Sequence, residues 1–459
     1  MGSDVDRLSL AEADKKYIWH PFTQMQEWEI EEPLIIESAQ GSYLLDTQGR
    51  EYLDGVSSLW TNLHGHRRRE IDRAIVSQVR KVSHSTLLGL ANVPSVALAQ
   101  RLVEIAPPGL TRVFYSDSGS TAVEIALKMA FQYWQQSSPA GRSKTKFISF
   151  KNGYHGDTVG AVGVGGISLF HEIYRPLLLD SIQVESAYCY RCPSGLKHPG
   201  CSLACLDDLQ RTLETHHNET AAVIIEPLVQ GAGGMLVSPP GYLTRVREIC
   251  TRYSVLLIAD EVAVGFGRTG RMFACEHEAV RPDLLCLAKG ISGGYLPLAA
   301  TLATEEIFQG FLGRPQENRT FFHGHTYTGN PVACAAGLAS LDIFAKDRTI
   351  ERLQTKIGQM EKGLRRFREL PHVGDIRQRG FMVGIELVAD RSTKAPYAPQ
   401  MRMGARVARE SRPRGAILRP LGDVVVLMPP LSIKRTELAL LLDITYDSIV
   451  AATGCLTYG

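Results

Sequence analysis

The sequence predicts an α/β protein with a mainly parallel sheet, and two observations support this prediction. From Arg112 onward, short apolar runs alternate with helical segments: RVFYSDSG, KFISFKNGYHG, AAVIIEPLVQG, VLLIADE, LLCLAKG and PLAATLAT. Strands that alternate with helices are typical of parallel sheets. Two of the runs, at 255–259 and 284–288, are apolar throughout, as expected for strands buried on both faces.

The segments on either side of this region predict a second, smaller unit. Residues 17–60 contain short strand-like stretches separated by turn residues, which indicates a small antiparallel sheet. Helical stretches follow at 67–82 and 93–105, and a long helical region follows Asn330. Strand-like segments return beyond Pro371. We therefore expect 1–60 and 341–459 to pack together as an α+β domain beside a large domain at 61–340.

Composition excludes several classes of function. The 459 residues are 44% hydrophobic, and 50 Lys and Arg balance 48 Asp and Glu to give a net charge of +2. This balance offers no strong positive field for nucleic acid or an anionic membrane. No apolar run approaches the roughly 20 residues of a membrane span. The N-terminus is polar and mixed in charge, unlike a signal peptide, so we expect a cytoplasmic protein.

Four of the nine cysteines cluster in one stretch, CYRCPSGLKHPGCSLAC. Cys189 and Cys192 form a CxxC pair, and Cys201 and Cys205 form a CxxxC pair. The pattern resembles a zinc knuckle, but the gap between the pairs is shorter than usual. A surface insertion with free thiols is favoured over a structural metal, and no metal is expected at the catalytic site.

Asp260 and Lys289 end the two continuously apolar runs. Ligand sites in parallel sheets lie at the carboxyl ends of the strands, so we expect both residues in one crevice. A pyridoxal phosphate (PLP) enzyme needs this pair: the lysine forms a Schiff base, and the aspartate keeps the pyridine nitrogen protonated. On these two residues alone, a salt bridge at a sheet edge explains the pattern equally well.

Two further motifs favour the PLP interpretation. Gly119 and Ser120 open a helix directly after the strand RVFY, where free N–H groups and a hydroxyl suit a phosphate. Tyr154, at the end of another strand, can stack on a flat cofactor, and Asp157 can receive a substrate amine. Without the other motifs, a capped helix and a packing tyrosine are the simpler interpretations.

Two other motifs are better explained as loops. Gly265, Gly267 and Gly270 spell the dinucleotide fingerprint, but they do not lie directly between a strand and a helix. His323 and His325 lack a clear third metal ligand. A polar loop in which Thr326 is available for a phosphate is more economical.

ADEVAVGFGRTG, followed by the lysine in LLCLAKGISGGYLPLAA, is similar to the fold-type I, class III aminotransferases. The resemblance covers about residues 17–450. A narrower set of motifs resembles the family members that transfer an amino group to 8-amino-7-oxononanoate in biotin synthesis. These motifs are WHPFTQM, DGVSSLWTNLHGH, FYSDSGSTAVEIALKMA, NGYHGDT, HGHTYTGNP and LRPLGDVVVLMPP.

This resemblance implies a homodimer and a role for each candidate residue. Lys289 would carry PLP and move the proton between two carbons, while Asp260 would pair with the pyridine nitrogen. Gly119 and Ser120 would bind the phosphate. His325 and Thr326, contributed by the partner subunit, would also contact the phosphate. Tyr154 would stack on the ring and, with Trp60, line the substrate channel. Gly324 would contact the substrate, and Arg419 would bind the substrate carboxylate.

Two departures from the family pattern concern the amino donor. Members that use S-adenosylmethionine commonly have Tyr where Phe22 stands, and Pro where His325 stands. Phe22 looks more like the lysine-using branch. S-adenosylmethionine remains the expected donor, with lysine as the alternative.

Other functions fit the sequence less well. An ω-amino acid or diamine:pyruvate transaminase is the nearest enzymatic alternative, and Trp60 and HPFTQM disfavour it. An NAD-dependent oxidoreductase is disfavoured by the placement of the Gly265 loop. Asp260 and Lys289 together argue against a non-catalytic binding protein.

Overall fold

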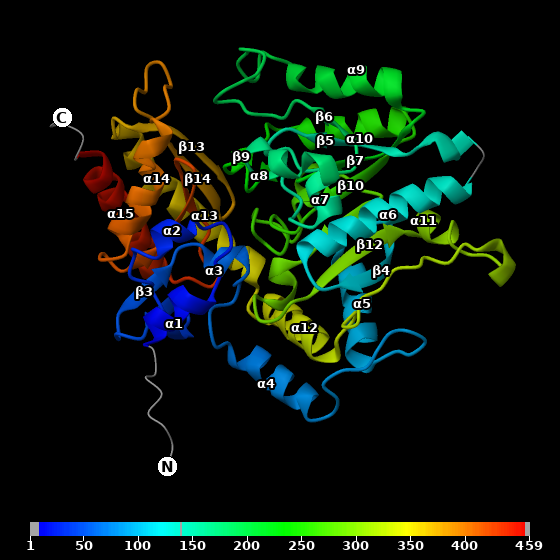
Figure 1. The fold of residues 1–459 in the computed structure, drawn as a ribbon, viewed down its shortest axis with the longest axis horizontal. Coiled ribbons are helices and arrows are strands. Elements are labelled where there is room, and N and C mark those ends of the chain that lie inside the picture. The colour runs from blue at the N-terminus through cyan, green and yellow to red at the C-terminus, as the bar shows by residue number, and fades with distance from the viewer. Residues whose placement is uncertain (1–8, 138–139, 455–459) are drawn as a thin grey trace.

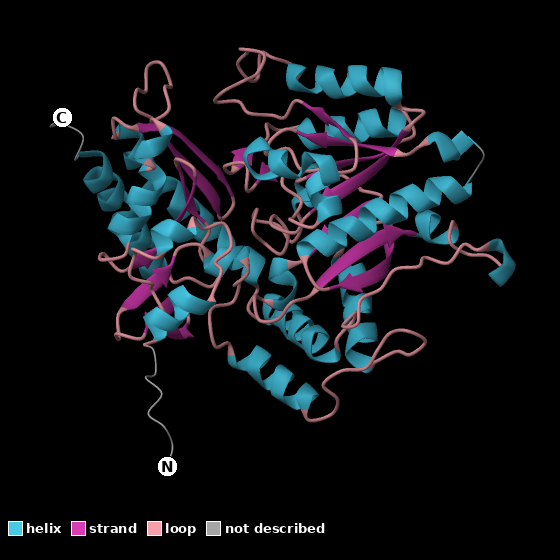
Figure 2. Ribbon diagram, viewed as in Figure 1, coloured by secondary structure: helices cyan, strands magenta, loops and turns pink. Residues whose placement is uncertain are grey.

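A seven-stranded sheet forms the centre of the larger part of the molecule in the computed structural model, which describes residues 9–137 and 140–454 (Figures 1 and 2). The strand order is β4-β12-β11-β10-β7-β5-β6. Only β12 is antiparallel to its neighbours. The bounds are β4 Leu110–Ser116, β5 Lys146–Phe150, β6 Ser181–Val184, β7 Thr220–Ile225, β10 Leu256–Asp260, β11 Leu284–Leu287 and β12 Ala299–Thr304.

Both faces of this sheet are buried, which explains the continuous apolar runs. Along β10, Leu257 and Ala259 belong to one core cluster, and Ile258 belongs to the other. Helix α6 (Gly119–Ser137) packs on the second cluster, while α5 (Val93–Ile105) and α10 (Tyr242–Arg252) pack on the first. The other helices of this part are α4 Arg69–Val79, α7 Val159–Gly163, α8 Ser168–His171, α9 Asp207–His216, α11 Glu305–Gln309 and α12 Pro331–Lys346.

Elements from the N-terminal and C-terminal segments of the chain lie together in the smaller part (Figure 1). The N-terminal strands β1 (Ile36–Gln40), β2 (Tyr43–Asp46) and β3 (Glu51–Asp54) are antiparallel, and β15 (Ala416–Ile417) joins β3 in parallel. A second sheet has the order β13-β14-β17-β16. The remaining bounds are α1 Leu10–Tyr17, α2 Met25–Trp28, α3 Ser57–Trp60, β8 Val229–Gln230, β9 Leu236–Val237, α13 Thr349–Leu364, β13 Val373–Arg379, β14 Met382–Leu387, α14 Met403–Ser411, β16 Arg419–Leu421, β17 Val424–Leu427 and α15 Arg435–Gly454.

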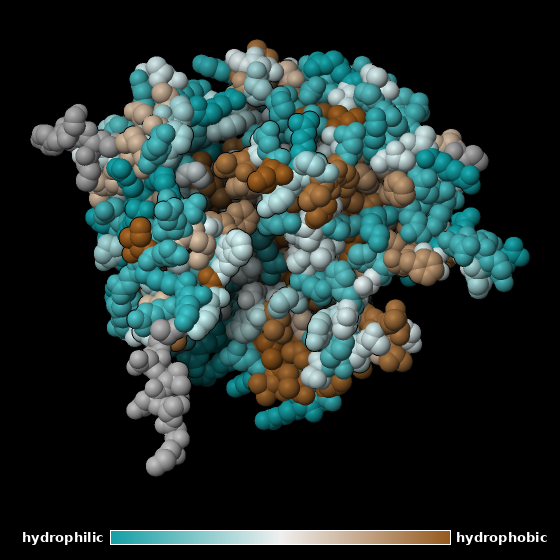
Figure 3. Space-filling view, viewed as in Figure 1, coloured by the Kyte–Doolittle hydropathy of each residue, from teal (hydrophilic) through white to brown (hydrophobic). Residues whose placement is uncertain are grey.

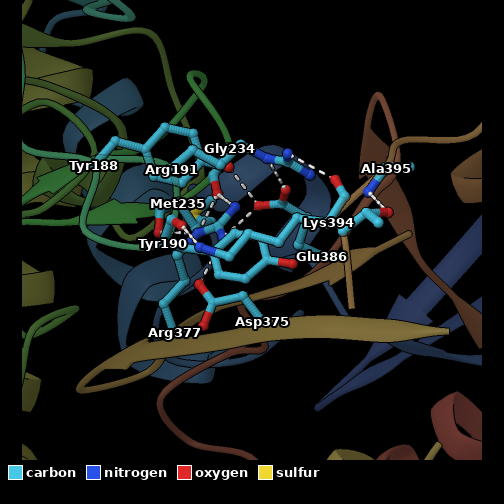
Figure 4. A network of polar contacts seen from close by, with 11 residues as sticks. Tyr188, Tyr190, Arg191, Gly234, Met235, Asp375, Arg377, Glu386, Lys394 and Ala395 are labelled. Carbon is cyan, nitrogen blue, oxygen red and sulfur yellow. Dashed lines mark hydrogen bonds and ion pairs between the residues drawn. The ribbon is translucent and has the colours of Figure 1, made fainter. Parts of the chain in front are cut away.

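A polar network connects the cysteine-bearing segment to the C-terminal sheet (Figure 4). Glu386, on β14, accepts hydrogen bonds from Tyr188, from Arg191 Nε at 2.8 Å and from Arg377 at 2.6 Å. Arg377 also donates to the carbonyl oxygen of Gly234 at 2.7 Å. Arg377 and Glu386 are both buried, and these hydrogen bonds pair their charges inside the protein.

The predicted α/β class and mainly parallel sheet are confirmed. Strand β6 has no counterpart among the predicted runs, because its sequence, SIQV, contains no continuous apolar stretch. Over the described ranges, no helix has both the length and the apolar character needed to cross a membrane.

Candidate active site

A cavity of about 390 Å³ lies at the carboxyl edge of the central sheet. The segments that follow β4, β5, β7, β10 and β11 all contribute to its wall. Because these strands point the same way, their ends deliver polar side chains to one place. The lining includes Trp60, Ser120, Tyr154, Glu226, Asp260 and Lys289.

Asp260 is the last residue of β10 and is only 4% exposed. Its Oδ2 lies 2.7 Å from His155 Nδ1, and its Oδ1 accepts the backbone N–H of Val262 at 3.1 Å. Asp260 is therefore a fixed buried carboxylate that faces the cavity.

Lys289 follows β11, and its Nζ lies 5.3 Å from the centre of the Trp60 ring. Burial lowers the pKa of Lys289, and the nearby carboxyl groups of Asp260 and Glu226 partly oppose that effect. A lysine whose pKa is lowered is a better nucleophile and proton acceptor near neutral pH. The structure thus brings Asp260 and Lys289 into one cavity, as the strand-end argument predicts.

Glu226 is a second buried carboxyl group in the cavity, beyond the residues predicted from the sequence. It accepts the backbone N–H of Tyr154 at 3.0 Å and that of Gly231 at 2.9 Å. Burial raises the pKa of Glu226 to about 7. The signal was present in AAVIIEP, because Glu226 ends an apolar run just as Asp260 does. His155, the partner of Asp260, was likewise in a quoted motif without an assigned role.

The N-terminus of α6 forms one wall of the cavity through Gly119 and Ser120. Ser120 Oγ accepts the backbone N–H of Asp157 at 3.1 Å. A Cβ on Gly156 would lie 2.0 Å from Ser120 Oγ, so only glycine permits this close approach. The start of a 19-residue helix suits an anionic phosphate.

Tyr154 is tied to Asp157, because its hydroxyl donates to Asp157 Oδ2 at 2.6 Å. Burial and this hydrogen bond raise the pKa of Tyr154. The ring of Phe170 packs edge-on against Tyr154 at 6.4 Å and against Phe22 at 5.3 Å. Phe22 itself is 60% exposed and does not line the cavity, and neither does Asp157.

Arg419 begins β16 and does not line the cavity, but it is electrostatically coupled to Tyr154. Burial lowers the pKa of Arg419. Across residues 9–137 and 140–454, no carboxylate forms an ion pair with its guanidinium. An unpaired, partly buried guanidinium of this kind is available for a ligand carboxylate.

The loop that carries Gly324, His325 and Thr326 lies outside the cavity. His325 Nδ1 is 2.7 Å from Asp117 Oδ2, which belongs to the cavity wall. Gly324 and Thr326 are exposed. A single chain therefore does not bring these two residues to the site.

The four clustered cysteines are free thiols. Within the part of the chain that the structure describes, no group of three His, Cys, Asp or Glu side chains is placed to hold a metal ion. The insertion connects β6 to α9 and lies beside the network of Figure 4 rather than at the cavity.

The cavity residues fit PLP. They supply an amine, a buried carboxylate to keep a ring nitrogen charged and a helix N-terminus for a phosphate. They also supply the ring of Trp60, which lies 5.3 Å from Lys289 Nζ.

One family model and several known proteins match this chain. The family model for class-III aminotransferases matches residues 24–449. Adenosylmethionine-8-amino-7-oxononanoate aminotransferase of Nitratidesulfovibrio vulgaris is 59% identical over 97% of this chain and 82% of that protein. The crystal structure of the protein of that name from Methanocaldococcus jannaschii is 49% identical and covers 96% of this chain and 98% of its own, with a TM-score of 0.91.

A solved amine transaminase from an uncultivated Pseudomonas species, in its PLP-bound form, is also similar. It is 37% identical, covers 95% of this chain and 99% of its own, and has a TM-score of 0.91. The chain shares the type I fold of PLP-dependent transferases with these structures. It belongs to the class III aminotransferases, enzymes that use pyridoxal phosphate as cofactor.

Proposed function

We propose that this enzyme transfers an amino group from S-adenosylmethionine to 8-amino-7-oxononanoate and forms 7,8-diaminononanoate in biotin synthesis. The observation that carries the proposal is identity of 50% or more, over nearly the whole chain, to relatives named for this activity. The cavity supports it, because Asp260 and Lys289 lie together at the sheet edge. We place the reaction in the cytoplasm.

Each cavity residue has a distinct part in this proposal. PLP, when bound, stabilises negative charge at the substrate carbon that bears the nitrogen. Asp260, oriented by His155, would keep the pyridine nitrogen charged. Lys289 would hold the cofactor, and its lowered pKa lets Nζ accept a proton from substrate and return it. Gly119 and Ser120 would bind the phosphate through the start of α6.

The long keto acid would be oriented by Arg419, whose guanidinium is free to form a bidentate pair with its carboxylate. Tyr154 would stack on the cofactor ring and, with Trp60, line the channel. Phe170 extends this aromatic surface outward to Phe22. The apolar part of the keto acid would lie along that surface.

The active unit in this proposal is a homodimer. Gly324 and Thr326 are exposed, and their loop packs on the segment before α5, where the rings of His84 and Tyr327 lie 4.8 Å apart. That segment continues into exposed apolar side chains at Val76, Val79, Val82, Leu88, Leu90, Val93 and Val96. Figure 3 shows apolar surface over this region, below the centre of the view. A second copy would cover such a patch and would carry Thr326, with His325, to the neighbouring site.

A complementation assay tests this exchange of residues. Lys289→Ala and Thr326→Glu are each expected to be inactive, because the first loses the amine and the second repels the phosphate. Co-assembled chains would form one site with Lys289 and the partner's Thr326 intact. Recovered activity supports the homodimer, and no recovery in verified mixed dimers contradicts it.

The donor is tested by a side-by-side single-turnover assay with S-adenosylmethionine and lysine, followed by the absorbance of bound cofactor. 8-Amino-7-oxononanoate is then added, and 7,8-diaminononanoate is measured by mass spectrometry. We expect S-adenosylmethionine to convert the cofactor. Conversion by lysine alone would show that lysine is the amino donor. Failure to form 7,8-diaminononanoate with either donor would show that 8-amino-7-oxononanoate is not the acceptor. A comparison with a simple amine and pyruvate identifies a general ω-transaminase.

A further inference from the structure

The segment Ser57–Trp60, which enters the cavity wall, has an unusual backbone. Its four residues have φ values of 51°, 47°, 72° and 70°, so it forms one left-handed turn without a single glycine. Left-handed conformations are unfavourable for L-residues and normally occur one residue at a time. Backbone strain of this kind persists only where surrounding contacts enforce it, and it gathers at functional sites.

Asp54 is the residue that enforces the turn. It ends β3 and is 1% exposed. Its Oδ1 accepts the backbone N–H of Ser58 at 2.8 Å, and its Oδ2 accepts the Ser58 hydroxyl at 2.8 Å. His66 Nε2 lies 3.0 Å from the same Oδ2. Both carboxylate oxygens therefore accept hydrogen bonds from Ser58, a left-handed residue of the turn.

The surroundings are shaped to receive the turn. Ser57 Oγ donates to the carbonyl oxygen of Met428 at 2.7 Å, which attaches the start of the turn to the C-terminal part of the chain. A Cβ on Gly294 would lie 2.8 Å from the backbone N of Asn62 and from the carbonyl carbon of Thr61, so glycine is required there. These contacts leave the turn little freedom to relax.

The turn directs two neighbouring side chains in opposite directions. Leu59 is 45% exposed, whereas Trp60 is 6% exposed and lines the cavity. The Trp60 ring lies 5.3 Å from Lys289 Nζ. The ring is therefore a fixed part of the cavity wall beside the lysine.

We propose that Asp54 is a positioning residue: it holds the left-handed turn, and the turn fixes the Trp60 ring at the cavity wall, where the ring contacts the bound substrate. The inference rests on the proposed amination and adds a residue that contacts neither substrate nor cofactor. Asp54 acts on the substrate through Ser58 and Trp60. Its effect on catalysis must therefore disappear when the Trp60 side chain is absent.

A double-mutant cycle measures this dependence. Asp54→Asn is expected to lower kcat/KM about tenfold in the parent enzyme and by less than about twofold in a Trp60→Ala background. Ser58→Ala, which removes only the hydroxyl contact, is expected to show the same dependence with a smaller loss, and it serves if Asp54→Asn yields no folded protein. An equal loss in both backgrounds would overturn the proposal.

Asp46 provides a matched control. It is also 1% exposed, and it holds a turn on the neighbouring strand by accepting the backbone N–H groups of Gln48 and Arg50 at 2.9 Å each. That turn does not line the cavity. Asp46→Asn is expected to lower the midpoint of thermal unfolding without changing kcat/KM. A loss of kcat/KM like that of Asp54→Asn would show general loosening of the sheet and would overturn the proposal.

A second readout is independent of activity and of the substrate. In cofactor-free protein, the fluorescence of Trp60 is obtained by subtracting the spectrum of Trp60→Phe from that of the parent. Trp60 is expected to be protected from acrylamide in the parent and in Asp46→Asn, and quenched in Asp54→Asn. Unchanged protection in Asp54→Asn would overturn the positioning role even if 8-amino-7-oxononanoate proves not to be the substrate.

Discussion

The carboxyl edge of the central sheet and the loop around Gly324 and Thr326 both carry predicted site residues, but they differ in how those residues are held. Asp260 is buried and has two hydrogen bonds, and Lys289 lies within the same cavity. Thr326 is exposed, and a Cβ on Gly324 would meet nothing within 4 Å. The edge is organised by one chain alone, whereas Gly324 and Thr326 do not line the cavity of their own chain.

This difference indicates that the sheet edge carries the residues for chemistry, whereas the loop around Gly324 and Thr326 depends on assembly with a second chain. Buried strands fix the direction of the residues that end them, so catalytic groups at the edge are set when the sheet folds. The exposed loop needs a second surface before its residues can act. Variants at the edge should therefore impair chemistry in an intact fold, and variants on the loop should depend on the partner.

The largest expected effect belongs to Lys289. Lys289→Ala should reduce turnover by more than about 10³-fold, because acid–base catalysis alone contributes about 10² to 10⁴-fold and the covalent attachment is also lost. The far-ultraviolet circular dichroism should match the parent. Steady-state assays with the preferred donor and acceptor measure the loss. Turnover within tenfold of the parent would show that Lys289 is not the catalytic lysine.

Asp260→Asn should come next, with retained cofactor and a loss of about 10²-fold in turnover. The amide cannot keep a ring nitrogen charged, although it can still accept a hydrogen bond. Asp283→Asn is a suitable control, because Asp283 accepts the backbone N–H of Leu257 and a guanidinium N–H of Arg247 beside the start of the same strands. Equal losses in the two variants would mean that Asp260 only supports the sheet.

Arg419→Ala should weaken binding of the keto acid by about 2–5 kcal/mol, as expected for removing one side of a buried charged pair. The affinity for the amino donor should change less. Separate KM values for the two substrates measure this difference, and Arg419→Lys tests whether bidentate geometry is needed beyond charge. Equal losses for both substrates would assign Arg419 a supporting role.

The smallest effect concerns Glu226 and pH. Its folded-state pKa of about 7 lies above its ordinary value of 4.5, so the folded protein holds an extra proton between pH 4.5 and 7. This group's stabilisation is present below pH 4.5 and is lost as pH rises through 7, by at most about 1.4 kcal/mol per pH unit. The free energy of unfolding of cofactor-free Glu226→Gln, relative to the parent, should therefore increase from pH 5 to pH 8.

Glu261 serves as the comparison for that measurement. Burial raises the pKa of Glu261 to about 7 as well, but its carboxylate accepts the N–H groups of Ala274 and Cys275 and does not line the cavity. Glu261→Gln should reproduce the pH dependence of stability. Only Glu226→Gln should also alter the pH profile of kcat. Identical pH profiles of kcat for Glu226→Gln and Glu261→Gln would show that Glu226 has no role in catalysis.

The sequence predicted the central sheet and its edge because apolar runs, and the polar residues that end them, are local signals. Asp260, Lys289, Gly119 and Tyr154 follow from that rule, and Glu226 obeys it too but was overlooked. The left-handed turn Ser57–Trp60 could not be predicted, because SSLW contains no glycine to mark it. The contact between His325 and Asp117 joins segments 208 positions apart, which no local pattern reveals.

The domain boundaries at 60 and 340 and the roles of the individual site residues remain predictions. The sequence does not show that β15 pairs with β3, because the paired residues lie 363 positions apart and β15 consists only of Ala416 and Ile417. The roles of Phe22 and Thr326 depend on a substrate and a partner. Their side chains are exposed in the single chain.

The central claim is that Lys289, at the end of β11, is the residue that holds the cofactor. Reduction of the purified, PLP-loaded enzyme with borohydride, followed by proteolysis and peptide mass spectrometry, tests it directly. We predict one pyridoxyl-modified peptide with the modification on Lys289. A modification on another lysine, or an unmodified Lys289 in fully loaded enzyme, would contradict the account.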